Sequence, residues 1–172
     1  MTLAQWAALL VGLQRLGELW LSRRNGRRLL AEGGREIGAG HYPVLIAVHV
    51  GWLAAIAFLV PADAPVYWSA VAAYLVVQAG RAWVIATLGR YWTTRVIDMP
   101  AAPLVTGGPY RWVRHPNYVV VVLEVALLPL AFGAWEIALV FSAANLAVLA
   151  WRLRIENAAL ARRAALPHLN TR

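Results

Sequence analysis

Long apolar segments, each ended by arginines or by a proline-containing turn, are the feature that most restricts how this chain can fold. They account for a composition of 61% hydrophobic and only 14% charged residues, whereas soluble domains carry about 25% charged residues. A helix on the surface of a soluble protein needs a polar face, and most of these segments are apolar on all sides over the length of a bilayer crossing. The sequence therefore predicts a polytopic membrane protein.

Five apolar segments are expected to form membrane helices. They cover approximately residues 3–21, 43–60, 66–88, 117–130 and 137–151. The first lacks a basic leader and a small-residue cleavage site, so it is expected to be a retained span. The last two are joined at 132–135 and are expected to form a helical hairpin. The predicted fold is thus all-α, one integral-membrane domain over 1–172, with three spans in 1–88 and a connection, the hairpin and a tail in 89–172.

The distribution of charge predicts an orientation. The chain has a net charge of +8, from 16 basic and 8 acidic residues. Segments 22–40, 89–116 and the C-terminal tail are rich in arginine, whereas the turns at 61–65 and 133–136 have none. With five spans, all three basic segments lie on one side, so the N-terminus is expected outside and the C-terminus in the cytoplasm of an inner-membrane protein. Arginines at the ends of spans do not indicate nucleic-acid binding.

Cysteine and histidine usage narrows the possible chemistry. There is no cysteine, which excludes disulfides, thiolate metal ligands and a cysteine nucleophile. The four histidines are scattered, without the close pairing of a helical zinc motif, so no metal is expected.

Two polar clusters are not explained by membrane spans alone. One is 104–118, with the sequence LVTGGPYRWVRHPNY, and the other is 152–157, with the sequence RLRIEN. They flank the last hairpin, whose antiparallel path brings them together at the cytoplasmic face, where they can form a pocket. Three simpler interpretations stay open: arginines as topology anchors, Arg152 and Glu156 as an ordinary i, i+4 pair, and the tyrosines and tryptophan as an interfacial belt.

These clusters resemble the isoprenylcysteine carboxyl methyltransferase family. The resemblance rests on 104–110, on Arg-His-Pro-Asn-Tyr at 114–118, and on Arg152 and Glu156 one hairpin later, and it covers roughly the C-terminal half. The Arg-His-Pro-x-Tyr string also occurs in phospholipid methyltransferases and some sterol reductases, whereas the string, its spacing and the downstream pair together are more specific. The resemblance implies S-adenosylmethionine as cofactor, held between the connection and the last two helices and not in a Rossmann domain.

The resemblance also implies roles for individual residues. Arg152 would bind the methyl acceptor and, with His115, form the catalytic pair. The implied cofactor contacts are Ala102, Pro103, Leu104, Val105, Tyr110, His115, Pro116, Asn117, Tyr118 and Glu156. This chain has Ala102 where relatives often have histidine, and Asn157 where many have a second acidic residue, so one carboxylate is left for a cationic sulfonium. A carboxylate and aromatic faces suit such a cation.

Ionisable residues in the N-terminal half are candidates for the acceptor site. Arg15, Glu18, His41 and His49 lie in or at the edge of apolar segments, where ionisable groups are costly and often functional. The alternative is that Arg15 pairs with Glu18 and that His49 binds a backbone carbonyl. The region resembles a bacterial branch of the family associated with type III polyketide synthases, whose members are thought to O-methylate long-chain alkylpyrones or alkylresorcinols.

The predicted function is O-methylation of a lipophilic acceptor at the membrane, preferably a long-chain polyketide enol or phenol. The alternatives are a prenylcysteine carboxylate as acceptor, phospholipid N-methylation, and a membrane scaffold without catalysis. A reductase of the sterol type lacks a nicotinamide-site signal. The expected partners are a lipophilic small molecule and the bilayer, and the sequence does not define an oligomeric state.

Overall fold

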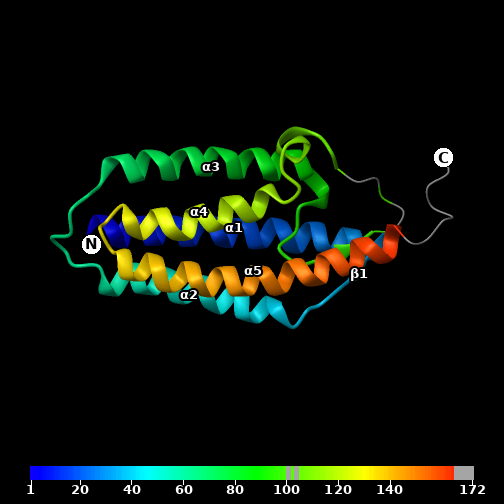
Figure 1. The fold of residues 1–172 in the computed structure, drawn as a ribbon, viewed down its shortest axis with the longest axis horizontal. Coiled ribbons are helices and arrows are strands. Elements are labelled where there is room, and N and C mark those ends of the chain that lie inside the picture. Colours follow the sequence, from blue (N-terminus) through cyan, green and yellow to red (C-terminus); the bar gives the residue numbers. More distant parts are fainter. Residues whose placement is uncertain (100–101, 103–104, 165–172) are drawn as a thin grey trace.

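Five long helices lie along a common direction and form an elongated bundle (Figure 1). The computed structural model describes residues 1–99, 102 and 105–164, and side chains as far as residue 158. The helices are α1 (Leu3–Ala31), α2 (His41–Leu59), α3 (Trp68–Leu88), α4 (Pro116–Leu130) and α5 (Trp135–Ala164). The expectation of an all-helical fold is confirmed.

Helix α1 is longer than the sequence indicated. It begins at a capping box in which Thr2 Oγ1 accepts from the Gln5 backbone N–H and Gln5 Oε1 accepts from that of Thr2. It then continues to Ala31, so the prediction of a loop from residue 22 was wrong over its first ten residues. Arginine is a good helix former and nothing breaks the helix before Gly33, where φ is +91°.

The C-terminal hairpin is confirmed, with one difference. Helices α4 and α5 are joined at Gly133, whose φ is +68°. Helix α5 is a single helix of 30 residues, whereas the sequence indicated a span ending near residue 151 and a separate basic helix. Arginines after the apolar part continue the helix without a break, because no proline or glycine intervenes.

A short antiparallel strand pair ties the end of α1 to the connection after α3. Strand β1 (Arg35–Glu36) pairs with β2 (Ile97–Asp98), with Arg35 opposite Asp98 and Glu36 opposite Ile97. Two residues a strand are too few to produce a periodic sequence signal. The pairing helps to fix the connection beside the N-terminal half, where Thr94 reaches the site described below.

Three helices are long and apolar enough to cross a membrane, judged over the described residues: His41–Leu59, Trp68–Tyr91 and Trp135–Ala158. Helix α4 is apolar but has only 15 residues, and α1 carries charges at its middle. Large apolar side chains are exposed on the outside of the bundle, among them Leu10, Trp20, Phe58, Val76 and Leu139. In water such a surface would associate, so the bundle is suited to lipid.

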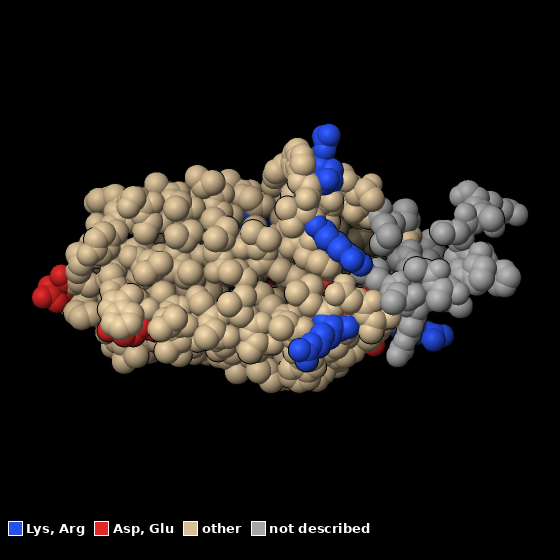
Figure 2. Space-filling view, viewed as in Figure 1, with Lys and Arg blue, Asp and Glu red and all other residues tan. Residues whose placement is uncertain are grey.

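Basic side chains gather at one end of the bundle. Figure 2 shows them toward the end that carries the connection and the last turns of α5, whereas the opposite end shows acidic side chains and no basic ones. The turns at that opposite end contain Asp63 and Glu136. The structure thus brings the arginine-rich segments to one end, as the charge pattern of the sequence requires.

Candidate active site

Arg152 on α5 joins three parts of the chain at the basic end of the bundle. Its Nε donates to the hydroxyl of Tyr118 on α4 at 2.7 Å, and its Nη1 donates to the backbone carbonyl of Thr94 in the connection at 2.5 Å. Its side chain is 7% exposed. Glu156 lies one turn further on α5, with Oε1 3.5 Å from Arg152 Nε. The guanidinium is therefore held on two sides by fixed oxygen acceptors.

Thr94 is itself fixed by the N-terminal half. Its hydroxyl lies 2.8 Å from Ser22 Oγ on α1 and 3.1 Å from the Tyr42 hydroxyl on α2, and its backbone N–H donates to Ser22 Oγ at 2.9 Å. The position of Arg152 thus depends on α1, α2, α4 and α5 together. Thr94 was not predictable from the sequence, because its contact with Arg152 is made by a backbone oxygen.

His115 and Tyr118 form a stacked aromatic pair at the start of α4. Their ring centroids are 5.3 Å apart with an interplanar angle of 14°, and His115 Nδ1 lies 3.6 Å from Glu156 Oε2. His115 is the N-cap of α4, and Pro116 occupies its first turn, where proline is favoured because no helical N–H partner is lost. The histidine ring is therefore aimed at the carboxylate of α5.

Two polar atoms at this cluster are buried and unpaired within the described part of the chain: His115 Nε2 and Asn117 Oδ1. Buried polar atoms normally have a partner, so unpaired ones at a cleft indicate where a ligand or water binds. Tyr110, in the short helix η2 (Gly108–Arg111), completes the cluster. Burial and, less strongly, Glu156 raise the pKa of its phenol to about 12, so it stays a neutral hydroxyl.

The structure gathers most of the residues that the sequence singled out for a cofactor. Pro116, Asn117 and Tyr118 share the first turn of α4 with His115 before it, and Glu156 faces them from α5. Val105 and Ala102 belong to the connection, while Pro103 and Leu104 lie outside the described residues.

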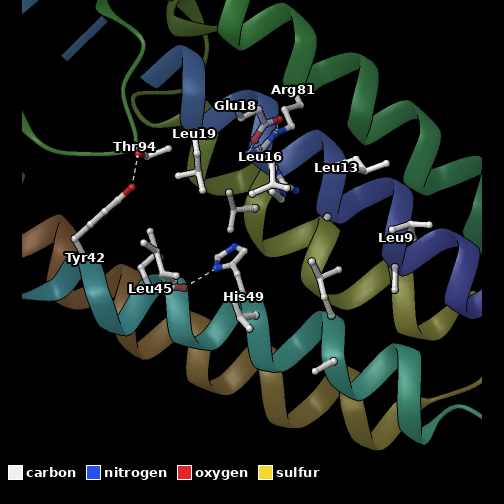
Figure 3. A pocket seen from close by; sticks show the side chains of 18 of the residues that line it. Leu9, Leu13, Leu16, Glu18, Leu19, Tyr42, Leu45, His49, Arg81 and Thr94 are labelled. Atoms are coloured by element: carbon white, nitrogen blue, oxygen red, sulfur yellow. Dashed lines mark hydrogen bonds and ion pairs between the residues drawn. The ribbon is translucent and has the colours of Figure 1, made fainter. Parts of the chain in front are cut away.

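A largely apolar cavity of about 700 Å³ lies between α1 and α2 and reaches the Arg152 end of the site. In Figure 3 leucines of α1 face α2 across it, with Tyr42, Leu45 and His49 on the α2 side. Asn117 and Tyr118 of α4 and Arg152 of α5 are among its lining residues. The cavity therefore connects the polar cluster with a long apolar space.

A charged network crosses the bundle on one wall of this cavity. Arg81 on α3 donates to Glu18 at 2.5 and 2.6 Å and to Glu124 on α4 at 2.8 Å. Arg15 donates to the same two carboxylates at 2.8 and 2.7 Å. Gln14 and Gln78 add hydrogen bonds to Glu18 and Glu124. The alternative in which Arg15 pairs with Glu18 is confirmed, and the second arginine and second carboxylate, each a lone charge in an apolar segment, were missed.

The two intramembrane histidines have different surroundings. His49 lines the cavity, and its Nδ1 lies 2.9 Å from the Leu45 carbonyl (Figure 3). The alternative in which His49 binds a backbone carbonyl is thus confirmed, although the ring also faces the cavity. His41 is 1% exposed and packs edge-on against Trp151 at 6.2 Å. It is not among the residues that line the cavity, so its predicted contact with an acceptor has no support from this geometry.

Comparison with known proteins identifies the group to which this site belongs. The model of the isoprenylcysteine carboxyl methyltransferase (ICMT) family matches residues 70–162, just over half of the chain, including α3, the connection, α4 and most of α5. The chain belongs to the isoprenylcysteine carboxyl methyltransferase family. The family resemblance expected from 104–118 and 152–157 is confirmed, and the chain is a member of a family of membrane methyltransferases.

Similarity to one bacterial protein extends beyond the matched region. The chain is 37% identical over 152 residues to the Bacillus subtilis (strain 168) protein named "Uncharacterized protein YpbQ". The alignment covers 86% of this chain and 90% of that protein. The alignment is too long to be confined to the C-terminal half. No solved structure matches.

Proposed function

We propose that this ICMT-family protein transfers a methyl group from S-adenosylmethionine to an oxygen of a lipophilic acceptor, preferably a long-chain polyketide enol or phenol. The observation that carries this proposal is that the polar cluster and the apolar cavity are continuous with each other. The cluster of His115, Tyr118 and Glu156 meets, at Arg152, an apolar cavity of about 700 Å³ that lies between two lipid-facing helices. Such a cavity is suited to an alkyl chain that enters from the bilayer.

The residues at the cluster fit S-adenosylmethionine. A single carboxylate, Glu156, and the stacked rings of His115 and Tyr118 offer favourable surroundings for a cationic group. The unpaired His115 Nε2 and Asn117 Oδ1 offer hydrogen-bonding positions for its polar groups. When bound, the cofactor would supply an activated methyl group for an acceptor oxygen that has already lost its proton, with the bonding pair of the methyl group retained by sulfur.

Arg152 orients the acceptor. Tyr118 and Thr94 hold its Nε and Nη1, while its Nη2 makes no hydrogen bond to the described residues. Arg152 also lines the cavity, so we assign Nη2 to the acceptor oxygen. A guanidinium there favours the ionised form of an acidic hydroxyl, which is the form that attacks. The apolar cavity keeps water from this oxygen, and the two fixed hydrogen bonds keep the arginine from following the ligand.

A prenylcysteine carboxylate is the second candidate acceptor, and the family's own name favours it. Arg152 fits a carboxylate as well as a phenolate. A phospholipid amine fits less well, because a cationic guanidinium would repel a protonated amine. In the alternative without catalysis, the cluster would be a structural remnant and changes at Glu156 would have no functional effect.

We further propose the topology that the charge distribution favours. All five helices would cross or enter the bilayer, with the basic end of the bundle and the methyl-transfer site in the cytoplasm and the N-terminus outside. The separation of basic and acidic ends in Figure 2 supports this orientation.

Calorimetric titration with S-adenosylhomocysteine tests the cofactor site. We expect micromolar binding to the detergent-purified protein and an affinity about tenfold lower for Glu156→Gln, because the substitution removes one charge-assisted contact. Glu136→Gln is the matched control, since Glu136 is exposed in the turn at the opposite end of the bundle. Absence of binding to well-folded wild-type protein would contradict the proposal and favour the alternative without catalysis.

The same titration is expected to depend on pH through His115. Burial lowers the pKa of His115 below its ordinary value of 6.5, Glu156 partly offsets this, and Arg114 lowers it further. The ring is thus neutral near pH 7 and gains a charge only on acidification. An imidazolium would then pair with Glu156 and repel the ammonium group of the ligand, so affinity should be level near pH 7 and fall on acidification. His115→Gln should flatten this decline, and an unchanged profile in that variant would assign the decline to another group.

A further inference from the structure

The last turns of α1 carry arginines that have no acidic partner. Arg23, Arg24, Arg27 and Arg28, which together are called the arginine face below, are exposed. None of them forms an ion pair with the residues that the structure describes. We propose that the arginine face binds the phosphate groups of anionic phospholipids. This inference goes beyond methyl transfer and rests only on the proposed topology, in which this end of the bundle lies in the cytoplasm.

The two sides of these helical turns have different surroundings. Positions 23, 24, 27 and 28 have the i, i+1, i+4, i+5 spacing that places side chains on one side of a helix. The opposite side is buried and consists of Ser22, Asn25, Gly26 and Leu29. The end of α1 lies next to β1, at the end of the bundle that carries the connection (Figure 1). Because the buried side packs on the protein, the arginine face points away from it.

The two glutamates that follow α1 are already paired. Glu32 forms an ion pair with Arg90, and Glu36 forms one with Arg95. The partial negative charge of a helix C-terminus favours basic residues only within the last turn. Arg28 lies in that turn, but the other three arginines come before it. Their counter-charge therefore has to come from outside the described protein.

The length of α1 places the arginine face at the depth of the lipid headgroups. The helix has 29 residues, which is about 43 Å at about 1.5 Å per residue, whereas the hydrocarbon core of a bilayer is about 30 Å thick. Trp20 is 63% exposed, and the guanidinium carbon of Arg24 lies 5.8 Å from the centre of its ring. Exposed tryptophans are enriched at the boundary between hydrocarbon and headgroups. The turns that follow Trp20 therefore reach the phosphate groups.

The type of basic residue also suits phosphate. All sixteen basic residues of the chain are arginines. A guanidinium group can bind a phosphate with two parallel hydrogen bonds, whereas the ammonium group of lysine acts as a point charge. Arginines four residues apart on a helix are neighbours, so two of them can approach one headgroup. The cytoplasmic leaflet carries anionic phospholipids, which attract such a cluster.

Phospholipid binding at this face has a consequence for the connection. On the buried side of the same turns, Ser22 Oγ accepts from the Thr94 backbone N–H at 2.9 Å, and Asn25 donates to two backbone carbonyls at 3.1 and 2.9 Å. The Thr94 carbonyl in turn accepts from Arg152. A ligand that binds only the folded state stabilises it. Bound phospholipid should therefore raise the temperature at which α1 separates from the connection and the protein unfolds.

Native mass spectrometry of the full-length protein in a non-ionic detergent tests the inference. The probes are phosphatidylglycerol and zwitterionic phosphatidylcholine with the same acyl chains. We expect wild type to bind phosphatidylglycerol about tenfold more tightly, and the triple variant Arg23→Gln, Arg24→Gln, Arg27→Gln to lose this preference. Added phosphatidylglycerol should also raise the unfolding temperature of wild type more than that of the variant.

The matched control is the triple variant Arg35→Gln, Arg111→Gln, Arg154→Gln. It removes the same charge from exposed positions at the same end of the bundle but outside α1, and it should keep the preference. No preference in wild type would overturn the inference. An equal loss in both triple variants would also overturn it, because net charge would then attract the lipid without a defined site.

The wild-type protein alone distinguishes a lipid from a free phosphate. If soluble glycerol phosphate binds as tightly as phosphatidylglycerol, the face recognises a phosphate group in solution and the assignment to phospholipid is wrong. If phosphatidylglycerol binds preferentially but leaves the unfolding temperature of wild type unchanged, the stabilising effect on the connection is refuted. Neither result depends on the folding of a variant or on methyl transfer.

Discussion

Replacement of Arg81 by glutamine is expected to destabilise the protein by about 3–5 kcal/mol, the range observed when one partner of a buried ion pair is removed. Arg81 is 6% exposed and binds both Glu18 and Glu124. Without it, two buried carboxylates share the single positive charge of Arg15. Thermal unfolding in detergent, followed by loss of the monodisperse elution peak, measures the effect.

A control and a second variant separate this effect from general disruption. Arg90 also forms an ion pair, with Glu32, but its side chain is 55% exposed, so Arg90→Gln should cost no more than about 1 kcal/mol. The double variant Arg81→Met, Glu18→Met leaves Arg15 paired with Glu124 and should recover part of the loss. Similar small losses for Arg81→Gln and Arg90→Gln would show that the network does not hold α1, α3 and α4 together.

This network illustrates what a single sequence can and cannot predict. Arg15 and Glu18 are three residues apart, so helical geometry alone places them on one face. Arg81 and Glu124 meet them only through the packing of α3 and α4 against α1, which no local pattern encodes. The useful sequence signal was charge itself: an apolar segment with one charge needs a partner in another segment. The lone Arg81 and the lone Glu124 carried this signal, but which segments they would meet followed only from the packing of the helices.

The ends of the helices were also only partly predictable from the sequence. The apolar segments predicted the helices, but not where α1 and α5 end, because arginine suits both a helix and a polar loop. The turn after α1 requires glycine at position 34 as well as at position 33. A side chain at position 34 would lie 2.6 Å from Met99 Sδ and 2.7 Å from the Leu29 carbonyl. This restriction comes from the connection that packs on the turn, so it depends on tertiary structure.

The polar cluster was the most predictable part of the site, since His115 and Tyr118 are close in the chain and Arg152 and Glu156 share one helix face. The cavity was the least predictable. Most of the residues that α1 and α2 contribute to its walls are apolar and carry the same sequence signal as any lipid-facing residue. Of the four N-terminal candidates, Arg15, Glu18 and His49 line the cavity and His41 does not. Their polar character marked them as unusual, and only the packing shows which ones face the cavity.

Replacement of Arg152 by lysine is expected to reduce kcat about a hundredfold while cofactor affinity changes far less. Lysine keeps the charge but has one nitrogen, so it cannot bind the Tyr118 hydroxyl and the Thr94 carbonyl and also hold an acceptor oxygen. Displacement of a positioning group by about 1 Å is enough for a loss of this size. Single-turnover methylation together with S-adenosylhomocysteine titration separates the two effects.

Arg154→Lys is the matched control, because Arg154 is two residues away on the same helix and exposed. If both variants keep wild-type activity, positive charge at this position is sufficient and the fixed geometry of Arg152 has no special role. If Arg152→Lys loses acceptor affinity and not kcat, the arginine only binds the acceptor and does not align it. A selective loss of kcat is the result that the two short hydrogen bonds of Arg152 predict, because they fix the direction in which its free nitrogen points before the acceptor arrives.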